Sequence, residues 1–230
     1  MAYDLEEQEQ LDELKAWWKA HGHIGLLVVG VAIASSIVVQ GWKYYQNKQS
    51  KEASAQFQAL TQADPKNIKA IQSLSAGLME KYASTPYAGR AAVVAAKANF
   101  ATGDAKSAKA QLEWAAKNAQ EDPVKSIALL QLAAIQLDEK QYAAALKTLA
   151  ENHDAGFDGI FADLKGDILV AQNKKTEAKA AYEEALTKLD VKNHYSSYTQ
   201  HKLNNSNNAY VFGRLCFCHF YKLRDKSEHG

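Results

Sequence analysis

The stretch AKAAYEEAL, residues 178–186, decides the fold of this 230-residue chain. It places a small residue, Ala178, four positions before the large Tyr182, and a second small residue, Gly166, lies twelve positions before Ala178. The same spacing occurs twice more upstream, with registers that repeat after 37 and then 33 residues. The three matching sets are Ala96, Ala108 and Leu112; Ala133, Ala145 and Leu149; and Gly166, Ala178 and Tyr182.

Each unit of this repeat is expected to be a helical hairpin. Polar pairs that suit a tight turn, at 103–104, 139–140 and 173–174, lie between the two small residues of each unit. The small residues allow two helices to approach closely, and the larger residue fills the next layer. This is the tetratricopeptide pattern, and one such hairpin cannot bury its apolar face without stacked neighbours. An ordinary all-helical bundle with accidental alanine spacing is the alternative.

Two segments flank the first hairpin on its N-terminal side. An amphipathic helix is expected from Ile68 to Tyr82, where it caps the array, and Thr85-Pro86 ends it. Before it, Asp64-Pro65 is expected to form a turn, with Asp64 as the cap and Pro65 at the first helical position. Few prolines and abundant Ala, Lys, Gln and Leu also favour an all-α fold.

A long apolar stretch precedes the repeats. Residues 20–42 contain no Lys, Arg, Asp or Glu, and about 20 apolar residues suffice to cross a hydrocarbon core. Aromatic side chains bracket this stretch, as is typical of membrane interfaces. They are Trp17, Trp18, Trp42, Tyr44 and Tyr45. We therefore expect a transmembrane helix over 20–42.

Two other interpretations of the apolar stretch stay open, a cleaved export signal and a buried core helix. Against the signal, the preceding segment is acidic rather than basic, and a cut at Ala32-Ile33-Ala34 would interrupt the apolar run. Lysines flank the stretch on both sides, so charge alone does not orient it.

The repeats predict a partner-binding groove, because the first helices of successive hairpins line a concave face. An apolar centre with charged ends suits a peptide or a partner helix better than a small molecule. Packing of several of these side chains against a further helix is the equal alternative. The expected groove residues are Arg90, Lys97, Phe100, Ile127, Leu130, Leu137, Ile160, Asp163, Asp167 and Val170.

Motifs for catalysis, cofactors and nucleic acid are lacking. No phosphate-binding glycine loop, zinc-hydrolase helix or nucleophile elbow occurs, and no run of Lys or Arg exceeds two. The loop around His153, Asp154 and Asp158 lacks the spacing of a calcium site and is expected to be a solvated turn. We therefore expect a non-enzymatic protein without a metal or other cofactor.

Several strings resemble one known family. They are GWKYYQ at 41–46, EASAQFQAL at 52–60, KYASTPYAGRAAVVAAKANFATGD at 81–104 and QLEWA at 111–115. With the order of the parts, they are similar to the ancillary SecYEG translocon subunit family over about residues 1–203. The resemblance implies a bacterial inner-membrane protein with an acidic cytoplasmic tail at 1–19 and periplasmic repeats at 43–203. It also implies two partners, the SecYEG translocon and a membrane-anchored periplasmic prolyl-isomerase-like chaperone.

Residues 204–230 depart from the family and are expected to form a poorly ordered tail. They hold both cysteines, Cys216 and Cys218, followed by His219. Three local ligands do not complete a structural zinc site. A strained disulfide between the two cysteines is an alternative.

The function expected from these features is that of an adaptor that docks a periplasmic chaperone beside the export channel and helps to transfer exported proteins to it. The alternative is a regulatory membrane protein whose cytoplasmic tail binds a response regulator. Leu11, Leu14 and Trp18 give that tail an apolar stripe, which would also suit the bilayer surface.

Overall fold

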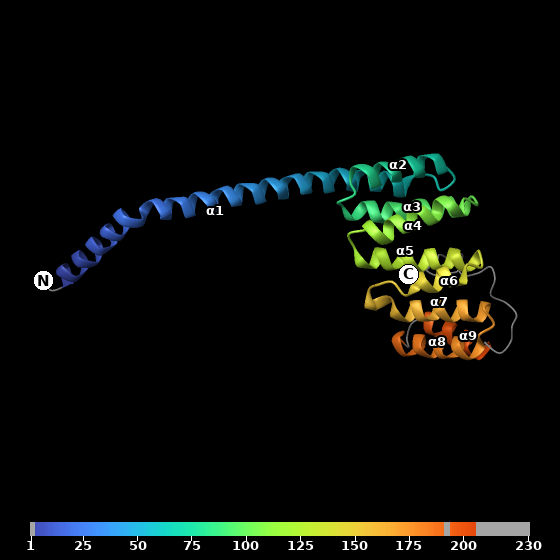
Figure 1. Ribbon diagram of the computed structural model, residues 1–230. Helices are drawn as coiled ribbons and strands as arrows, with labels where there is room; N and C mark the ends of the chain where they lie inside the picture. Colours follow the sequence, from blue (N-terminus) through green and yellow to red (C-terminus); the bar gives the residue numbers. More distant parts are fainter. Residues whose placement is uncertain (1–2, 191–193, 206–230) are drawn as a thin grey trace. The chain divides into compact units, whose positions relative to one another are not determined.

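The computed structural model describes residues 3–190 and 194–205, and every long element within them is an α-helix, as the sequence predicted (Figure 1). A short 3-10 turn, Ala155–Phe157, precedes the seventh helix. The helices are α1 (Tyr3–Gln62), α2 (Ile68–Lys81), α3 (Pro86–Ala101), α4 (Ala105–Asn118), α5 (Asp122–Asp138), α6 (Tyr142–Leu149), α7 (Asp158–Ala171), α8 (Lys175–Lys188) and α9 (His194–Asn205). Cys216, Cys218 and His219, with the predictions made for them, lie outside the described residues.

The chain forms two compact units, which divide between Lys51 and Glu52 inside α1. In the first unit, large apolar side chains such as Leu27 and Val38 are more than half exposed along the helix. From Leu26, α1 is long and apolar enough to cross a membrane, with a mean hydropathy of 1.7 in its best window. None of that window is buried in the protein, so the buried-core interpretation is wrong. The exact span 20–42 stays a prediction.

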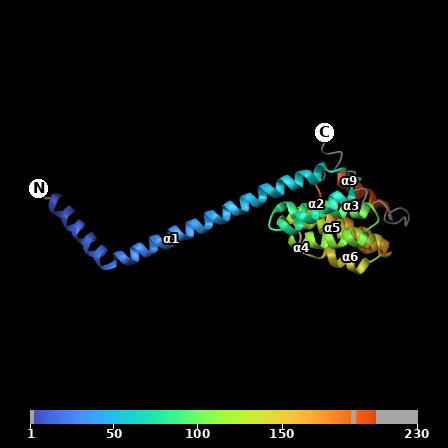
Figure 2. The same cartoon turned by 90° about the horizontal axis from the view of Figure 1, so that it is seen from above.

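The second unit is a stack of helical hairpins. Figure 1 shows the helices from α2 to α9 in successive layers, and Figure 2 looks along the same stack. The pairs α3–α4, α5–α6 and α7–α8 are the three predicted hairpins, and α3 lies against α5 as α5 lies against α7. The end of α1 belongs to this unit, because Ala53 and Leu60 pack with residues of α2 and α3.

The small residues that defined the repeat lie at the contacts between helices. All nine aligned residues, from Ala96 to Tyr182, are buried. In the third hairpin the contact leaves no room for a larger residue, since a Cβ atom added at Gly166 would lie 2.6 Å from Cδ1 of Tyr182. The alanines and the glycine are therefore required by the close packing of paired helices.

The turns of the three hairpins share one backbone conformation. Gly103, Lys140 and Asn173 occupy the same repeat position, and their φ angles are +87°, +60° and +62°. In each turn the next residue donates its backbone N–H to a carbonyl five residues earlier, as Asp104 does to Asn99 over 2.9 Å. This is the Schellman ending of a helix, in which the left-handed residue reverses the chain.

The start of α2 differs from the prediction. Asp64, Pro65 and Lys66 do form a turn, since the backbone N–H of Asn67 donates to the carbonyl of Asp64 over 2.8 Å. The helix, however, begins at Ile68, and the side chain of Asn67 caps it by accepting from the N–H of Ala70. Asp64 closes the turn by accepting from Lys66, so its carboxylate is not the helix cap.

Candidate functional site

The first helices of the hairpins, α3, α5 and α7, carry the predicted groove residues. They differ in exposure: Arg90 and Lys97 are exposed, Leu130 is buried, and five more are intermediate. The intermediate residues are Phe100, Ile127, Leu137, Ile160 and Val170. These side chains remain a predicted binding surface. One of them, Arg90, already forms a contact within the protein.

Arg90 links two repeats. Its guanidinium donates two hydrogen bonds, of 2.7 and 2.6 Å, to the carboxylate of Glu121 at the start of α5. This bidentate pair raises the pKa of Arg90 above its ordinary value. Arg90 therefore connects α3 to the start of α5, and a partner would meet it as part of an ion pair.

Asp163 and Asp167 do not lie on an open groove. Their exposed fractions are 1% and 7%, because α9 packs over this part of α7. The sequence left open that some of the groove residues pack against a further helix. The structure shows this packing for Asp163 and Asp167.

The two acids form the centre of a buried polar network with α9. Lys202, itself only 4% exposed, donates from Nζ to Asp163 and to Asp167 over 2.7 Å each. Asp163 also accepts hydrogen bonds of 2.9 Å from Tyr195 and Thr199. One ammonium therefore faces two carboxylates.

Asp167 has the less favourable surroundings of the two. It accepts a hydrogen bond of 2.8 Å from the hydroxyl of Tyr182 in addition to the one from Lys202. Burial raises the pKa of Asp167; the attraction of Lys202 opposes this change, and the charge of Asp163 adds to it. The pKa of Asp167 therefore lies above the ordinary aspartate value.

A second polar network, which the sequence did not indicate, joins the first three helices of the stack. Asn99, buried in α3, accepts from Gln72 of α2 over 2.6 Å and donates to Gln111 of α4 over 2.9 Å. The pair is repeated one unit later, where Thr148 donates to Gln136 over 2.9 Å. In the third unit the apolar residues Leu169 and Ala181 occupy the equivalent positions. The polar pair is therefore not a feature of every repeat, and the repeat pattern did not point to it.

The loop of His153 and Asp158 is a structural contact between repeats. The ring of His153 stacks on Phe161 with centroids 3.6 Å apart, and its Nε2 lies 3.1 Å from Asp158. Lys188 of α8 lies 3.3 Å from the other oxygen of Asp158. These contacts tie one side of the loop to α7 and α8, while Asn152, Ala155 and Gly156 are exposed, as the sequence predicted for a solvated turn.

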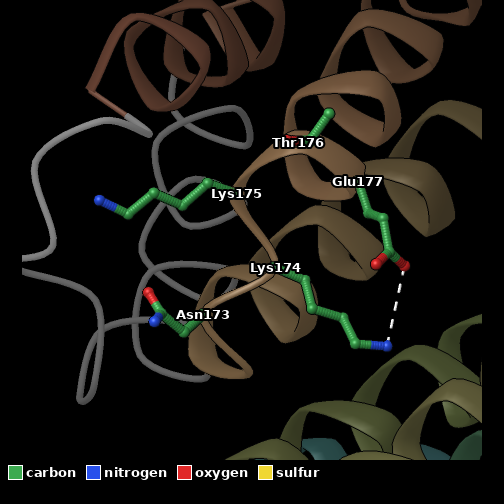
Figure 3. A pocket seen from close by; sticks show the side chains of 5 residues that line it. All are labelled: Asn173, Lys174, Lys175, Thr176 and Glu177. Carbon is green, nitrogen blue, oxygen red and sulfur yellow. Dashed lines mark ion pairs between the residues drawn. The ribbon is translucent and has the colours of Figure 1, made fainter.

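Among the described residues, one surface hollow lies at a hairpin turn and another lies between two helices. One, of about 410 Å³, lies at the turn between α7 and α8, where Lys174 and Glu177 form an ion pair of 3.8 Å (Figure 3). Its lining is polar, and in Figure 3 the side chains of Asn173 and Lys175 point away from the Lys174–Glu177 pair. The other, of about 360 Å³, lies between α2 and α4, beside Met79 and Trp114. Neither combines the groups that a catalytic site needs.

The remaining predictions concern metal binding and the membrane boundaries. Across the described part of the chain, no group of three or more His, Cys, Asp or Glu side chains is placed to hold a metal ion. The five aromatic residues expected at the membrane boundaries all lie on α1 and are more than half exposed, and Trp17 stacks on His21. Their position at the interface stays a prediction.

Comparison with known proteins identifies the family. The tetratricopeptide repeat-like domain family matches residues 15–208. A protein of Haemophilus influenzae named "Ancillary SecYEG translocon subunit" is 31% identical over 188 residues, which are 80% of this chain and 91% of that protein. The chain belongs to the ancillary SecYEG translocon subunit family.

Two other members with the same name show similar agreement. The Neisseria gonorrhoeae protein is 31% identical over 82% of this chain and 91% of its own length, and the Escherichia coli protein is 29% identical over 86% and 96%. No solved structure matches the chain. The members are named as translocon subunits, which agrees with the expectation of a non-enzymatic protein.

Proposed function

We propose that this chain is a membrane-anchored adaptor of the SecYEG translocon, whose repeats dock a periplasmic chaperone that receives exported proteins. The observation that carries the proposal is the relationship to ancillary SecYEG translocon subunits over most of both chains. The apolar part of α1 supports it, since an adaptor of a membrane channel needs an anchor in the same membrane.

The anchor contributes by raising local concentration. A protein held in the bilayer beside the channel meets its partners far more often than a freely diffusing one, without any new contact. We propose that the N-terminal tail is cytoplasmic and the repeats are periplasmic, so that chains that leave the channel meet the docked chaperone early.

The docking surface proposed for the chaperone is the face of α3, α5 and α7. Stacked helical hairpins bind extended peptides or helices along this face. The half-exposed apolar residues Phe100, Ile127 and Ile160 supply apolar contact area, and the exposed Lys97 supplies charge. Asp163 and Asp167 are left out of this surface because α9 covers them.

Isolation from membranes tests the translocon proposal. The tagged full chain, extracted in mild detergent, should recover the translocon subunits, and an unrelated single-span protein with the same tag should not. Equal recovery by both proteins would contradict the proposal.

The docking surface is tested by a matched pair of substitutions. Lys97→Glu on α3 should weaken binding of the periplasmic chaperone at least five-fold, while Lys117→Glu, on the exposed side of α4, should leave it unchanged. Both variants should still recover the translocon subunits, because their substitutions lie outside α1. An equal effect of the two substitutions on chaperone binding would remove the surface proposal.

A further inference from the structure

Helix α1 carries positive charge directly after its apolar part. Lys43, Lys48 and Lys51 follow Trp42, and no Asp or Glu occurs from residue 14 to residue 51. The three lysines are exposed, and among residues 3–190 and 194–205 no hydrogen bond or ion pair engages any of them. The next acid, Glu52, accepts a hydrogen bond of 3.2 Å from Tyr82. The segment 43–51 therefore presents three cations to the solvent or to a ligand.

The charges of this segment lie toward one side of the helix. Tyr44, Lys48 and Lys51 are spaced by four and three residues and therefore share one helix face, with Lys43 beside it. Elsewhere on the helix surface, Nε2 of Gln49 donates a hydrogen bond of 2.7 Å to the hydroxyl of Tyr45, and both side chains are uncharged. The segment therefore has a basic face that begins at an aromatic residue next to the apolar stretch.

The other end of the apolar stretch has the opposite charge. Residues 1–19 contain six acids and two lysines, and one of these lysines, Lys15, is paired with Asp12 over 3.0 Å. The two flanks of the stretch therefore differ in sign. An anionic membrane surface attracts the flank that leads to the repeats and repels the other one.

The lysines are close enough to the apolar stretch to reach lipid headgroups. An α-helix rises by about 1.5 Å per residue, so Lys43 and Lys48 lie within about 10 Å of Trp42 along the helix axis, and Lys51 lies about 13 Å from it. The polar layer on each side of a bilayer is about 5–8 Å thick, and its charge acts over about 8 Å more at physiological salt. The long side chains of the lysines extend this reach.

The proposed topology gives these lysines no other role. Lysines beside a membrane span favour the cytoplasmic side of that flank. In the proposed function this flank is periplasmic together with the repeats, so retention in the cytoplasm does not account for Lys43, Lys48 and Lys51. Contact with lipid headgroups accounts for them on either side of the membrane.

We propose that residues 43–51 bind anionic phospholipids, with Lys43, Lys48 and Lys51 in contact with the headgroup phosphates. The anchor thereby gathers anionic lipid around itself in the leaflet that faces the repeats, and not in the leaflet that faces the N-terminal tail. The inference rests on the proposed function only in taking α1 as a membrane anchor. The attraction is electrostatic, so the bound lipid exchanges with the bilayer and the preference weakens as the salt concentration rises.

Trp42 provides the reporter, because it directly precedes Lys43. The full-length protein is placed in vesicles of anionic phosphatidylglycerol mixed with zwitterionic phosphatidylcholine. In one set of vesicles the first lipid carries bromine, which quenches tryptophan fluorescence, near the headgroup end of its acyl chains, and in the other set the second lipid carries it. Both leaflets have the same composition, so the orientation of the chain in the vesicle does not affect the result.

Two reporter proteins compare the ends of the apolar stretch. Trp17→Phe with Trp18→Phe leaves Trp42 as the reporter, and Trp42→Phe leaves Trp17 and Trp18. Trp114, in the repeats, gives both proteins the same background. Trp42 should show a preference for phosphatidylglycerol of about three-fold or more at about 0.1 M salt. Trp17 and Trp18 should show no preference, because the acids of the tail repel the anionic lipid.

Substitutions in the Trp42 reporter protein assign the preference to the lysines. Replacing Lys43, Lys48 and Lys51 by Gln should abolish it, and replacing them by Arg should keep it, because Arg retains the charge and binds phosphate. The matched control replaces three exposed lysines of the second unit by Gln and should leave the preference unchanged. These control residues are Lys66, Lys69 and Lys81.

Three results would overturn the proposal. They are an equal affinity of Trp42 for the two lipids in the presence of the native lysines, a preference that the Gln variant retains, and an equal preference at both ends of the apolar stretch. The substituted side chains are exposed on a helix, so the Gln variant should keep the helical circular dichroism of the parent protein.

The lipid experiment separates this inference from the proposed function. Quenching of Trp42 by both lipids without a preference would leave the anchor in place and remove only the inference. A lysine-dependent preference in a protein that does not recover the translocon would leave the inference in place and contradict the proposed function. No quenching by either lipid would show that Trp42 does not lie at the bilayer, and would contradict both.

Discussion

Lys202 donates to Asp163 across 39 residues of sequence, and the pair is nearly removed from solvent, with Nζ 2.7 Å from Oδ2. A buried ion pair of this kind specifies where α9 docks more than it adds to stability, because two charges have lost their hydration. Asp167 shares the same ammonium and accepts a hydrogen bond from Tyr182, and burial raises its pKa. The two acids should therefore respond differently to the same substitution.

Asp163→Asn should destabilise the docking of α9 by about 2–3 kcal/mol, because a charged acceptor of three hydrogen bonds is lost in a buried site. Asp167→Asn should change it by less than about 1 kcal/mol, since the amide oxygen still accepts from Tyr182 and the excess negative charge is gone. Hydrogen exchange of α9 amides measures both changes. Equal losses for the two variants would contradict the description of the network.

The raised pKa of Asp167 gives the docking of α9 a defined pH dependence. Because the folded-state pKa is above the unfolded value of about 3.9, protonation favours the folded state. The stabilisation of the folded state that results from this raised pKa is fully present below the unfolded pKa. It is lost as the pH rises through the folded pKa. The protection of α9 should therefore fall with rising pH over that interval in the wild-type chain, and Asp167→Asn should remove this part of the dependence. If the protection of α9 in the wild-type chain rose with pH over the same interval, the prediction would be contradicted.

Gly166→Ala should destabilise the third hairpin by about 1–3 kcal/mol, since the new methyl group would overlap the ring of Tyr182. Gly77→Ala in α2 is the matched control, because the nearest atom to the new group is Oε1 of Gln56 at 3.7 Å. That change should be neutral or stabilise by up to about 1 kcal/mol through helix propensity. Thermal unfolding of both variants measures the difference, and a tolerated Gly166→Ala would show that the hairpin is looser than described.

Lys140→Gly should stabilise the protein by about 1 kcal/mol, because Lys140 has a φ of +60°, where side chains are strained and glycine is not. The same change at Lys147, a helical residue in the last turn of α6, should destabilise the protein. Chemical denaturation distinguishes the two. Destabilisation by both variants would mean that the turn does not need a left-handed residue.

The hairpins could be predicted from the sequence because their signal is local. Gly166, Ala178 and Tyr182 lie within 17 residues, and the requirement for close helix packing restricts the residue types at each position. The repeat alignment extends that restriction to the other two hairpins, so the helix pairs and their turns were predicted correctly. The cap of α2 was missed because Asp64 and Asn67 both suit a helix start, and the turn at Pro65 decides between them.

The surroundings of Asp163 and Asp167 could not be predicted. Two acids four residues apart on a helix have the same pattern whether solvent or another helix covers them. Their burial depends on where α9 lies, and the segment HYSSYTQHKLNN has no apolar stripe that would indicate a packed helix. The side chains that settle the question, Thr199 and Lys202, are of types that are mostly exposed in proteins.

The side of the membrane on which the repeats lie is the central claim of the proposed function, and thiol labelling in intact cells tests it most directly. With Cys216 and Cys218 replaced, Lys174→Cys presents a thiol in the exposed turn between α7 and α8, and Asp12→Cys presents one in the N-terminal tail. A reagent that crosses the outer but not the inner membrane should label the first variant and not the second, with the mass of the uncleaved chain. Labelling of Asp12→Cys alone would place the repeats in the cytoplasm and contradict the proposal that they receive exported proteins.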